Sequence, residues 1–177
     1  MKSIYFRTEQ PQDHSTVFQL IEAAFQHEPH SDHREQFLVE RLRKSTAFVP
    51  ELSIVAEENG HIVGYILLTK IQIQSQKNTT EALALAPIAV LPSEQGKGIG
   101  SQLIQFAHHR AKELGFSAII LLGHADYYPK FGYQKASKFG IQLPFEVPDE
   151  NAMAIELIPN SLQEVSGTVV YPQAFWE

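Results

Sequence analysis

Cysteine is absent from the 177-residue sequence. The chain therefore forms no disulfide, binds no zinc through cysteine and has no thiol nucleophile, and this composition fits the cytoplasm, where we expect the protein. Long hydrophobic runs are lacking too, and the opening MKSIYFRTEQ is too polar for a signal peptide. We therefore expect no membrane partner.

Positive charge is also scarce: 14 Lys and Arg stand against 20 Asp and Glu, a formal net charge of −6. Nucleic-acid-binding proteins carry a basic face that neutralises phosphates, so this balance predicts that no DNA or RNA is bound. The negative net charge still allows a small anion to bind to backbone amides, because local geometry determines whether such a site forms. No repeat or flexible linker divides the chain, which predicts a single domain over 1–177.

Hydrophobic periodicity predicts a mixed α+β fold. A strand at 5–10 leads to a helix capped by Asp13, and a second helix follows around 37–42. The remaining predicted elements are a hairpin over 52–74 that turns at Asn59-Gly60, a strand over 82–91 interrupted by Pro87, a helix over 98–115 ended by Gly115, a buried strand over 118–124, a short helix or turn over 126–133, and strands over 152–158 and 167–175. The unit over 82–122 predicts a right-handed parallel crossover.

Glycine clusters in LPSEQGKGIGSQL, 91–103, where three of five consecutive positions are glycine and a helix begins. The first N–H groups of a helix lack internal partners, and glycine lets a ligand approach them, so this segment predicts an anion cradle suited to phosphate. Lys97 adds positive charge. The P-loop pattern fails because Gly98 follows Lys97, and the dinucleotide pattern fails because Gly96, Gly98 and Gly100 are spaced G-x-G-x-G.

The segment from Gln95 to Gly100 matches the Gln/Arg-x-x-Gly-x-Gly/Ala signature of the GNAT acyltransferases. The segment from Tyr128 to Tyr133 matches the Tyr-x-x-x-Gly-Phe/Tyr element of the same superfamily, and LLGHADYYPKFGY with GTVVYPQAF resembles its YhbS-like branch. This resemblance covers essentially the whole chain. It implies a central mixed sheet with splayed strands around an acyl-CoA site, flanked by helices.

By this resemblance the co-substrate is acetyl-CoA, and no metal is expected. The pantetheine arm would pair with the irregular strand at Ile88, Ala89 and Val90. The resemblance places the pyrophosphate on the glycine loop, whose cofactor-binding residues are then Gln95, Gly96, Lys97, Gly98, Ile99, Gly100 and Ser101.

The resemblance also implies that Tyr128 is the general acid, with Tyr127 as its rival. A phenol is protonated at neutral pH and can donate to a departing thiolate. Many relatives carry a Glu on the preceding strand, but AIILLGH has no carboxylate. His124 and Asp126 at its end are candidates for the base, which stays open between them and water.

Histidines outside this pattern are His27, His30 and His33, which with Glu28 and Asp32 resemble a metal site in composition. Pro29 breaks any helical face there, so a solvated loop is the alternative. The resemblance places this loop beside the acceptor pocket. The pair His108-His109 is expected on the exposed side of the long helix.

These expectations together predict an N-acetyltransferase that transfers an acetyl group to a primary amine of a small molecule or peptide by direct attack. The alternative is a non-catalytic acyl-CoA-binding or sensing module, which the lack of a carboxylate on the strand before Tyr128 keeps open. The acceptor amine is not identified by the sequence, and a homodimer is compatible with it.

Overall fold

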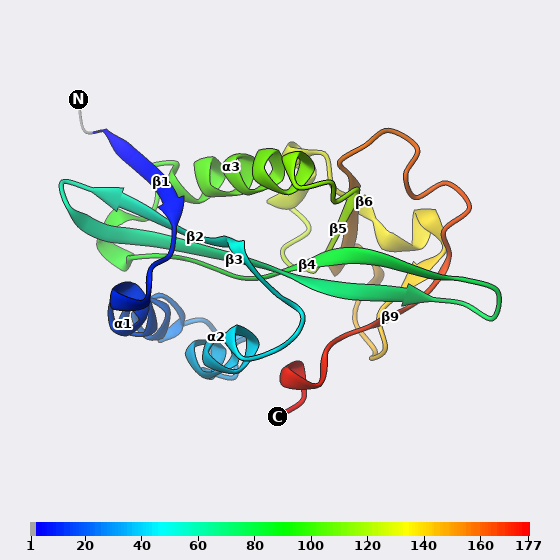
Figure 1. The fold of residues 1–177 in the computed structure, drawn as a ribbon, viewed down its shortest axis with the longest axis horizontal. Helices are drawn as coiled ribbons and strands as arrows, with labels where there is room; N and C mark the ends of the chain where they lie inside the picture. The colour runs from blue at the N-terminus through cyan, green and yellow to red at the C-terminus, as the bar shows by residue number, and fades with distance from the viewer. Residues whose placement is uncertain (1–2) are drawn as a thin grey trace.

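The computed structural model describes residues 3–177 (Figure 1). Nine strands of the described chain form one sheet, in the order β1-β2-β3-β4-β5-β8-β6, while β9 pairs with β3 and β7. The strands are β1 (Ile4–Thr8), β2 (Phe48–Glu58), β3 (His61–Gln74), β4 (Thr79–Val90), β5 (Ala118–Leu122), β6 (Gln134–Lys135), β7 (Ile141–Gln142), β8 (Ala152–Glu156) and β9 (Gly167–Val170).

Helices cover both faces of this sheet: α3 (Ile99–Glu113) lies on one face, and α1 (His14–Phe25) and α2 (Glu35–Arg43) lie on the other (Figure 1). Each helix buries the apolar residues that recur at three- and four-residue spacing. In α3 these are Leu103, Ala107 and Ala111, all fully buried. Within the described chain, no helix combines the length and apolar character needed to cross a bilayer.

Two predicted turns are confirmed. Asn59 and Gly60 both have positive φ, 52° and 79°, the conformation of a tight hairpin turn, and β2 pairs antiparallel with β3 on either side of it. Gly115 has φ 91° just after α3, and its N–H donates to the Lys112 carbonyl. Glycine supplies this left-handed residue because it has no Cβ to clash.

The predicted parallel crossover and the irregularity near Pro87 are also present. β4 and β5 run parallel and pair only at Leu83–Ile119 and Ala84–Ile120. Opposite the proline, the β3–β4 register shifts between Ile66 and Leu68. Beyond Ala84 the two strands continue without further pairing, to Val90 in β4 and to Leu122 in β5. They are therefore splayed at the end that leads into the glycine loop.

The structure differs from the sequence-based expectations at several places. The strand predicted over 167–175 ends at Val170, and Gln173–Phe175 form a short 3-10 helix after Pro172, which has no N–H to donate to a neighbouring strand. The two-residue strands β6 and β7 lie where no strand was predicted, since so short a segment has no periodicity to detect. Asp13 precedes α1 as predicted, but its carboxylate binds Arg7 and the Gln10 N–H rather than a helix amide. The Arg7 hydrogen bond holds the pKa of Asp13 below its usual value. His108 is partly buried, not exposed, because its ring packs on Tyr133.

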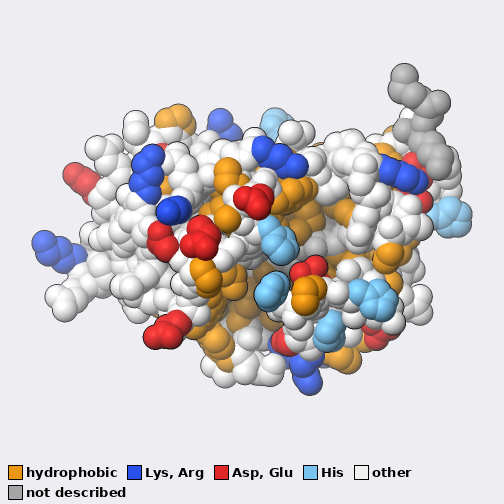
Figure 2. Space-filling model, turned by 180° about the vertical axis from the view of Figure 1, so that it is seen from behind, with side chains coloured by type: hydrophobic (Ala, Val, Ile, Leu, Met, Phe, Trp, Pro, Cys, Tyr) orange, Lys and Arg blue, Asp and Glu red, His pale blue; other side chains and the backbone are white. Residues whose placement is uncertain are grey.

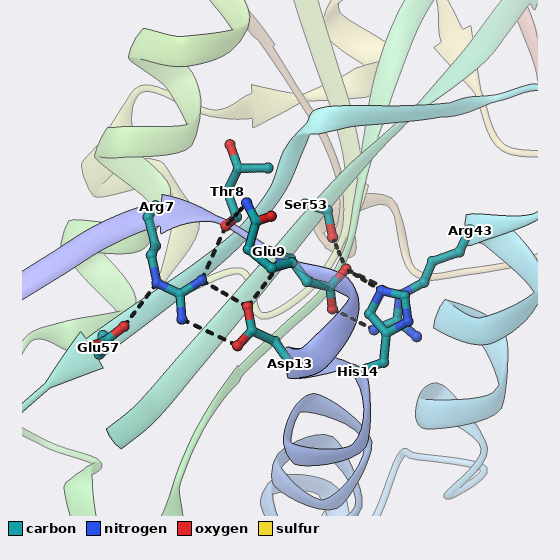
Figure 3. A network of polar contacts seen from close by, with 9 residues as sticks. Arg7, Thr8, Glu9, Asp13, His14, Arg43, Ser53 and Glu57 are labelled. Atoms are coloured by element: carbon teal, nitrogen blue, oxygen red, sulfur yellow. Dashed lines mark hydrogen bonds and ion pairs between the residues drawn. The ribbon is translucent and has the colours of Figure 1, made fainter. Parts of the chain in front are cut away.

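A buried carboxylate joins the first strand to the α1–α2 face (Figure 3). The Glu9 side chain is 2% exposed, accepts hydrogen bonds from Arg43 and Ser53, and has the His14 ring 3.7 Å away. Ser53 in turn bonds the hydroxyl of fully buried Tyr65 on β3. Such a charge is tolerated only with a counter-charge and hydrogen bonds around it. This network fixes the positions of α1 and α2 against the sheet.

Candidate active site

The glycine loop between β4 and α3 presents backbone to solvent. Gly96 and Gly98 have φ of 82° and 83°, a left-handed conformation that favours glycine. A Cβ built on Gly96 would have no heavy atom within 4 Å, and one on Gly98 would meet only the Gln102 side chain at 4.0 Å. The loop surface is therefore open, and the first amides of α3 lie beside it without partners inside the helix.

Gly100 allows a tyrosine to approach the first turn of α3. A Cβ at this position would lie 3.2 Å from the Tyr127 hydroxyl and 3.8 Å from Val90. That hydroxyl is 3.5 Å from the Ser101 hydroxyl, and the Lys130 ammonium lies 4.1 Å from the centre of the Tyr127 ring. Lys130 thus brings a second positive charge to this end of α3. Sequence reasoning missed it, although it lies inside the tyrosine motif.

The side chains of Gln95 and Lys97 both bond to neighbouring protein groups. The Gln95 amide donates to the Val90 carbonyl at 3.1 Å, which ties the loop to the end of β4. Lys97 is exposed, and its ammonium lies 2.9 Å from the Glu94 carboxylate, which raises the pKa of Lys97. The positive charge of Lys97 is therefore partly offset by Glu94.

The end of β4 has one paired edge and one edge that faces the splay. Ile88, Ala89 and Val90 pair with β3, and no β5 residue pairs with them on the other side. Ile88 and Val90 pack toward α3, whereas Ala89 packs toward α1 and α2. Since their side chains point to the two faces, an extended ligand inserted between the strands would contact the backbone of β4.

Tyr128 lies at the end of β5, beside the splay. Its ring packs so tightly on Gly123 that a Cβ there would come within 2.9 Å of the ring, so any larger residue would displace it. It also contacts the Tyr127 and Tyr133 rings edge-on, at 5.1 and 5.7 Å between ring centres. Burial raises the pKa of Tyr128 to about 12. This phenol therefore keeps its proton at neutral pH.

His124 and Asp126 are both exposed beyond the end of β5. The His124 ring lies 3.9 Å from the Glu28 carboxylate, which brings the loop between α1 and α2 next to this strand end. Figure 2 shows histidine and acidic side chains gathered around a hollow with a hydrophobic floor. Among residues 3–177 no group of three His, Asp or Glu side chains is arranged as a metal site requires.

Comparisons with known proteins agree with this geometry. The sequence profile described as "Acetyltransferase (GNAT) family" matches residues 15–133. The uncharacterized N-acetyltransferase YjhQ of Escherichia coli K12 is 34% identical over 67% of this chain and 66% of its own, so the match spans just under two thirds of that relative. The uncharacterized N-acetyltransferase YhbS of the same strain is 24% identical over 96% of each chain.

Two solved structures share the fold across almost the whole chain. E. coli YhbS in complex with CoA superposes with a TM-score of 0.89 at 24% identity, covering 100% of this chain and 94% of its own. A GNAT family acetyltransferase from Brucella melitensis in complex with acetyl-CoA superposes with a TM-score of 0.80 at 30% identity, and the match covers 98% of each chain. The predicted fold class and the predicted resemblance are confirmed. The chain belongs to the GNAT acetyltransferase family.

Proposed function

We propose that this protein is an acetyl-CoA-dependent N-acetyltransferase that acetylates a primary amine of a small molecule or peptide. The observation that carries the proposal is the splay of β4 and β5 after Ala84 and Ile120, directly before an open glycine loop. The B. melitensis relative, 30% identical, binds acetyl-CoA in its solved structure. A chain without cysteine also suits a cytoplasmic location, which is part of the proposal.

The glycine loop would hold the pyrophosphate through its backbone. Gly96 and Gly98 leave open space where side chains would stand, and α3 begins directly after them at Ile99, where the helix dipole favours an anion. Lys97 and Lys130 would add positive charge at the rim. The pantetheine amides would pair with the free edge of β4 at Ile88, Ala89 and Val90, as an added strand does.

The acyl transfer needs one proton delivered and one removed. The amine nitrogen attacks the acetyl carbonyl carbon, the carbon–sulfur bond breaks, and the leaving thiolate takes a proton. We assign that donation to Tyr128, whose phenol stays protonated because burial raises its pKa. A β4 amide near Val90 would stabilise the oxyanion. His124, directly or through water, would accept the proton that the amine loses.

A non-catalytic acyl-CoA-binding module is the second candidate. It is favoured by the sequence of β5, AIILL, which has no carboxylate to serve as base. It would keep the glycine loop and the splay but release no CoA.

Calorimetric titrations with acetyl-CoA, CoA, ATP and NAD test the binding half of the proposal. We expect acetyl-CoA and CoA to bind and the two nucleotides not to bind. A thiol-release assay over a panel of primary amines then tests turnover. Absence of acetyl-CoA binding would overturn the proposed function, and binding without thiol release for any amine would favour the non-catalytic module.

A further inference from the structure

A cavity of about 720 Å³ is lined by residues between Ser137 and Ala152, on the face of the sheet opposite α3. Its wall includes Leu143 and Ala152, which belong to the same apolar cluster as Ala84 and Ile120, the last pair before the strands separate. Ala152 pairs with Leu122, the final residue of β5. The wall of the cavity at Ala152 is therefore one strand away from the end of β5, where the proposed acetyl transfer takes place.

Leu122 itself adds apolar surface between the cavity and the splay. Alternation along β5 places it on the same face as Ile120, toward the cavity, and it is 48% exposed. About half of this leucine is thus left uncovered by the described chain. A ligand that reached from the cavity to the end of β5 would cover it.

Three aromatic rings, which we name the aromatic corner, pack together beside this cavity: Phe145, Tyr171 and Trp176. Phe145 lines the cavity and stacks on Tyr171 at 6.1 Å between ring centres. Trp176 meets both rings edge-on, at 6.1 Å from Phe145 and 6.0 Å from Tyr171. Phe145 and Trp176 are 39% and 55% exposed, so this corner presents apolar faces to solvent.

The aromatic corner is held in place by the rest of the fold. The Arg41 side chain of α2 donates a hydrogen bond to the Ala174 carbonyl at 2.9 Å, which fixes the segment between Tyr171 and Trp176 against that helix. Tyr171 is partly buried and also packs on Phe175 at 4.9 Å. The Trp176 ring stands nearly at right angles to Phe145 and Tyr171, so the corner offers both ring faces and ring edges to a further aromatic ring.

The charged side chains that line the cavity are both acidic. Glu146 and Asp149 lie in its wall, and none of the lining residues is Lys, Arg or His. Asp149 lies 3.6 Å from the Lys135 ammonium, whereas no ion pair joins Glu146 to another residue of 3–177. A primary amine is an ammonium ion at neutral pH, so this wall would attract it and disfavour an anion.

We propose that the cavity and the aromatic corner bind the acceptor, and that this acceptor is a primary amine joined to an aromatic ring by a short alkyl chain. The proposal rests on the acetyltransferase function proposed above and names its substrate class. The ring would pack on Phe145 and Trp176, the ammonium would pass Glu146, and the amine would reach the end of β5 near Leu122.

Trp176 is the sole tryptophan of the chain and can report occupancy directly. We would titrate 2-phenylethylamine into CoA-saturated protein, so that binding is read without turnover. A saturable change of tryptophan fluorescence is expected. Ethylamine, which lacks the ring, and 3-phenylpropionate, which carries the opposite charge, should each bind about tenfold or more weakly.

Two variants locate the site while keeping the reporter. Phe145→Ala should lower the affinity for 2-phenylethylamine by about 3–10-fold, which corresponds to the loss of one aromatic contact. Glu146→Gln should weaken the binding of 2-phenylethylamine but not the binding of the neutral 2-phenylethanol. Tyr5→Ala removes a 68% exposed ring on the far edge strand β1 and should change nothing. The proposal would be overturned if 2-phenylethylamine bound wild type and Phe145→Ala equally well, or if ethylamine bound as tightly as 2-phenylethylamine. A titration of wild type with 2-phenylethylamine that gave no saturable fluorescence change would also overturn it.

A parallel calorimetric titration with acetyl-CoA separates this inference from the proposed function. If acetyl-CoA binds and 2-phenylethylamine does not, the acceptor assignment fails and the acetyltransferase stands. If 2-phenylethylamine binds at the aromatic corner and acetyl-CoA does not bind, the cavity is an amine site and the proposed function fails.

Discussion

The two sides of the site are built in different ways. The proposed cofactor side is one continuous segment, 88–101, in which backbone and glycines without side chains make the surface. The proposed acceptor side takes side chains from three distant segments: the loop between α1 and α2, the loop 143–149, and residues 171–176. A site made of backbone depends on conformation, whereas a site made of side chains depends on which segments meet. The following variants test that difference.

Tyr128→Phe should have the largest effect on activity, because Tyr128 is the proposed proton donor and its ring packs on Gly123, just after β5. Loss of the hydroxyl removes the proposed proton donor and keeps the ring contacts, so turnover should fall by about 10²–10⁴-fold with acetyl-CoA affinity unchanged. Steady-state kinetics and calorimetry measure the two quantities. Tyr127→Phe, whose hydroxyl faces Ser101, is the matched control and should be mild. If Tyr127→Phe lost activity while Tyr128→Phe kept it, Tyr127 rather than Tyr128 would be the proton donor.

Gly98→Asp should abolish most cofactor binding. It places a carboxylate where the pyrophosphate would lie, and like charges at such a contact cost several kcal/mol, or about 10²–10³-fold in affinity for acetyl-CoA. Gly115→Asp is the matched control, since Gly115 also has positive φ and open space but lies at the other end of α3. Calorimetry that found both variants equally impaired would show that backbone strain, not the anion site, is responsible.

Glu9→Ala should cost about 3 kcal/mol of unfolding free energy and leave cofactor affinity unchanged. The substitution leaves Arg43, whose side chain is 11% exposed, without its counter-charge. Glu57→Ala, which breaks the more exposed pair with Arg7, should cost less than about 1 kcal/mol. Urea unfolding of both variants gives the comparison. Equal losses would mean that the buried network does not hold the acceptor-side helices in place.

Stability should depend on pH through His108. Burial lowers the pKa of His108 to about 4 in the folded protein, whereas an unfolded histidine titrates near 6.5. The unfolded state therefore binds more protons between these values, and the stability present above about pH 6.5 is lost as pH falls to about 4, by at most about 3 kcal/mol. His108→Gln should flatten this dependence in urea unfolding, and His109→Gln, on the exposed side, should not. An unchanged profile in His108→Gln would contradict the assignment.

Lys97→Ala should have the smallest effect. The lysine is exposed and already paired with Glu94, so its loss should weaken acetyl-CoA by only a few-fold, and less at high salt than at low. Titrations at two salt concentrations measure it. A loss as large as that of Gly98→Asp would mean that the side chain, not the backbone, forms the main phosphate contact.

The sequence by itself determined the glycine loop before α3, the turns and the order of the main elements. Gln95 to Gly100, Asn59-Gly60 and Gly115 are local signals, because glycine permits a backbone conformation regardless of distant residues. Pro87 marked the irregular strand for the same reason. The proposed assignment of Tyr128 likewise rests on a motif contained in six consecutive residues.

Only the tertiary structure decided what each partly polar side chain contacts. His108 is partly buried because Tyr133 packs on it, and Asp13 binds Arg7 rather than its helix. Phe145 meets Trp176 although β8 and β9 separate them along the chain. These contacts join residues 6 to 31 positions apart, and no periodicity within one segment encodes them. For this reason the proposed acceptor side rests on contacts between distant segments, which only the tertiary structure shows.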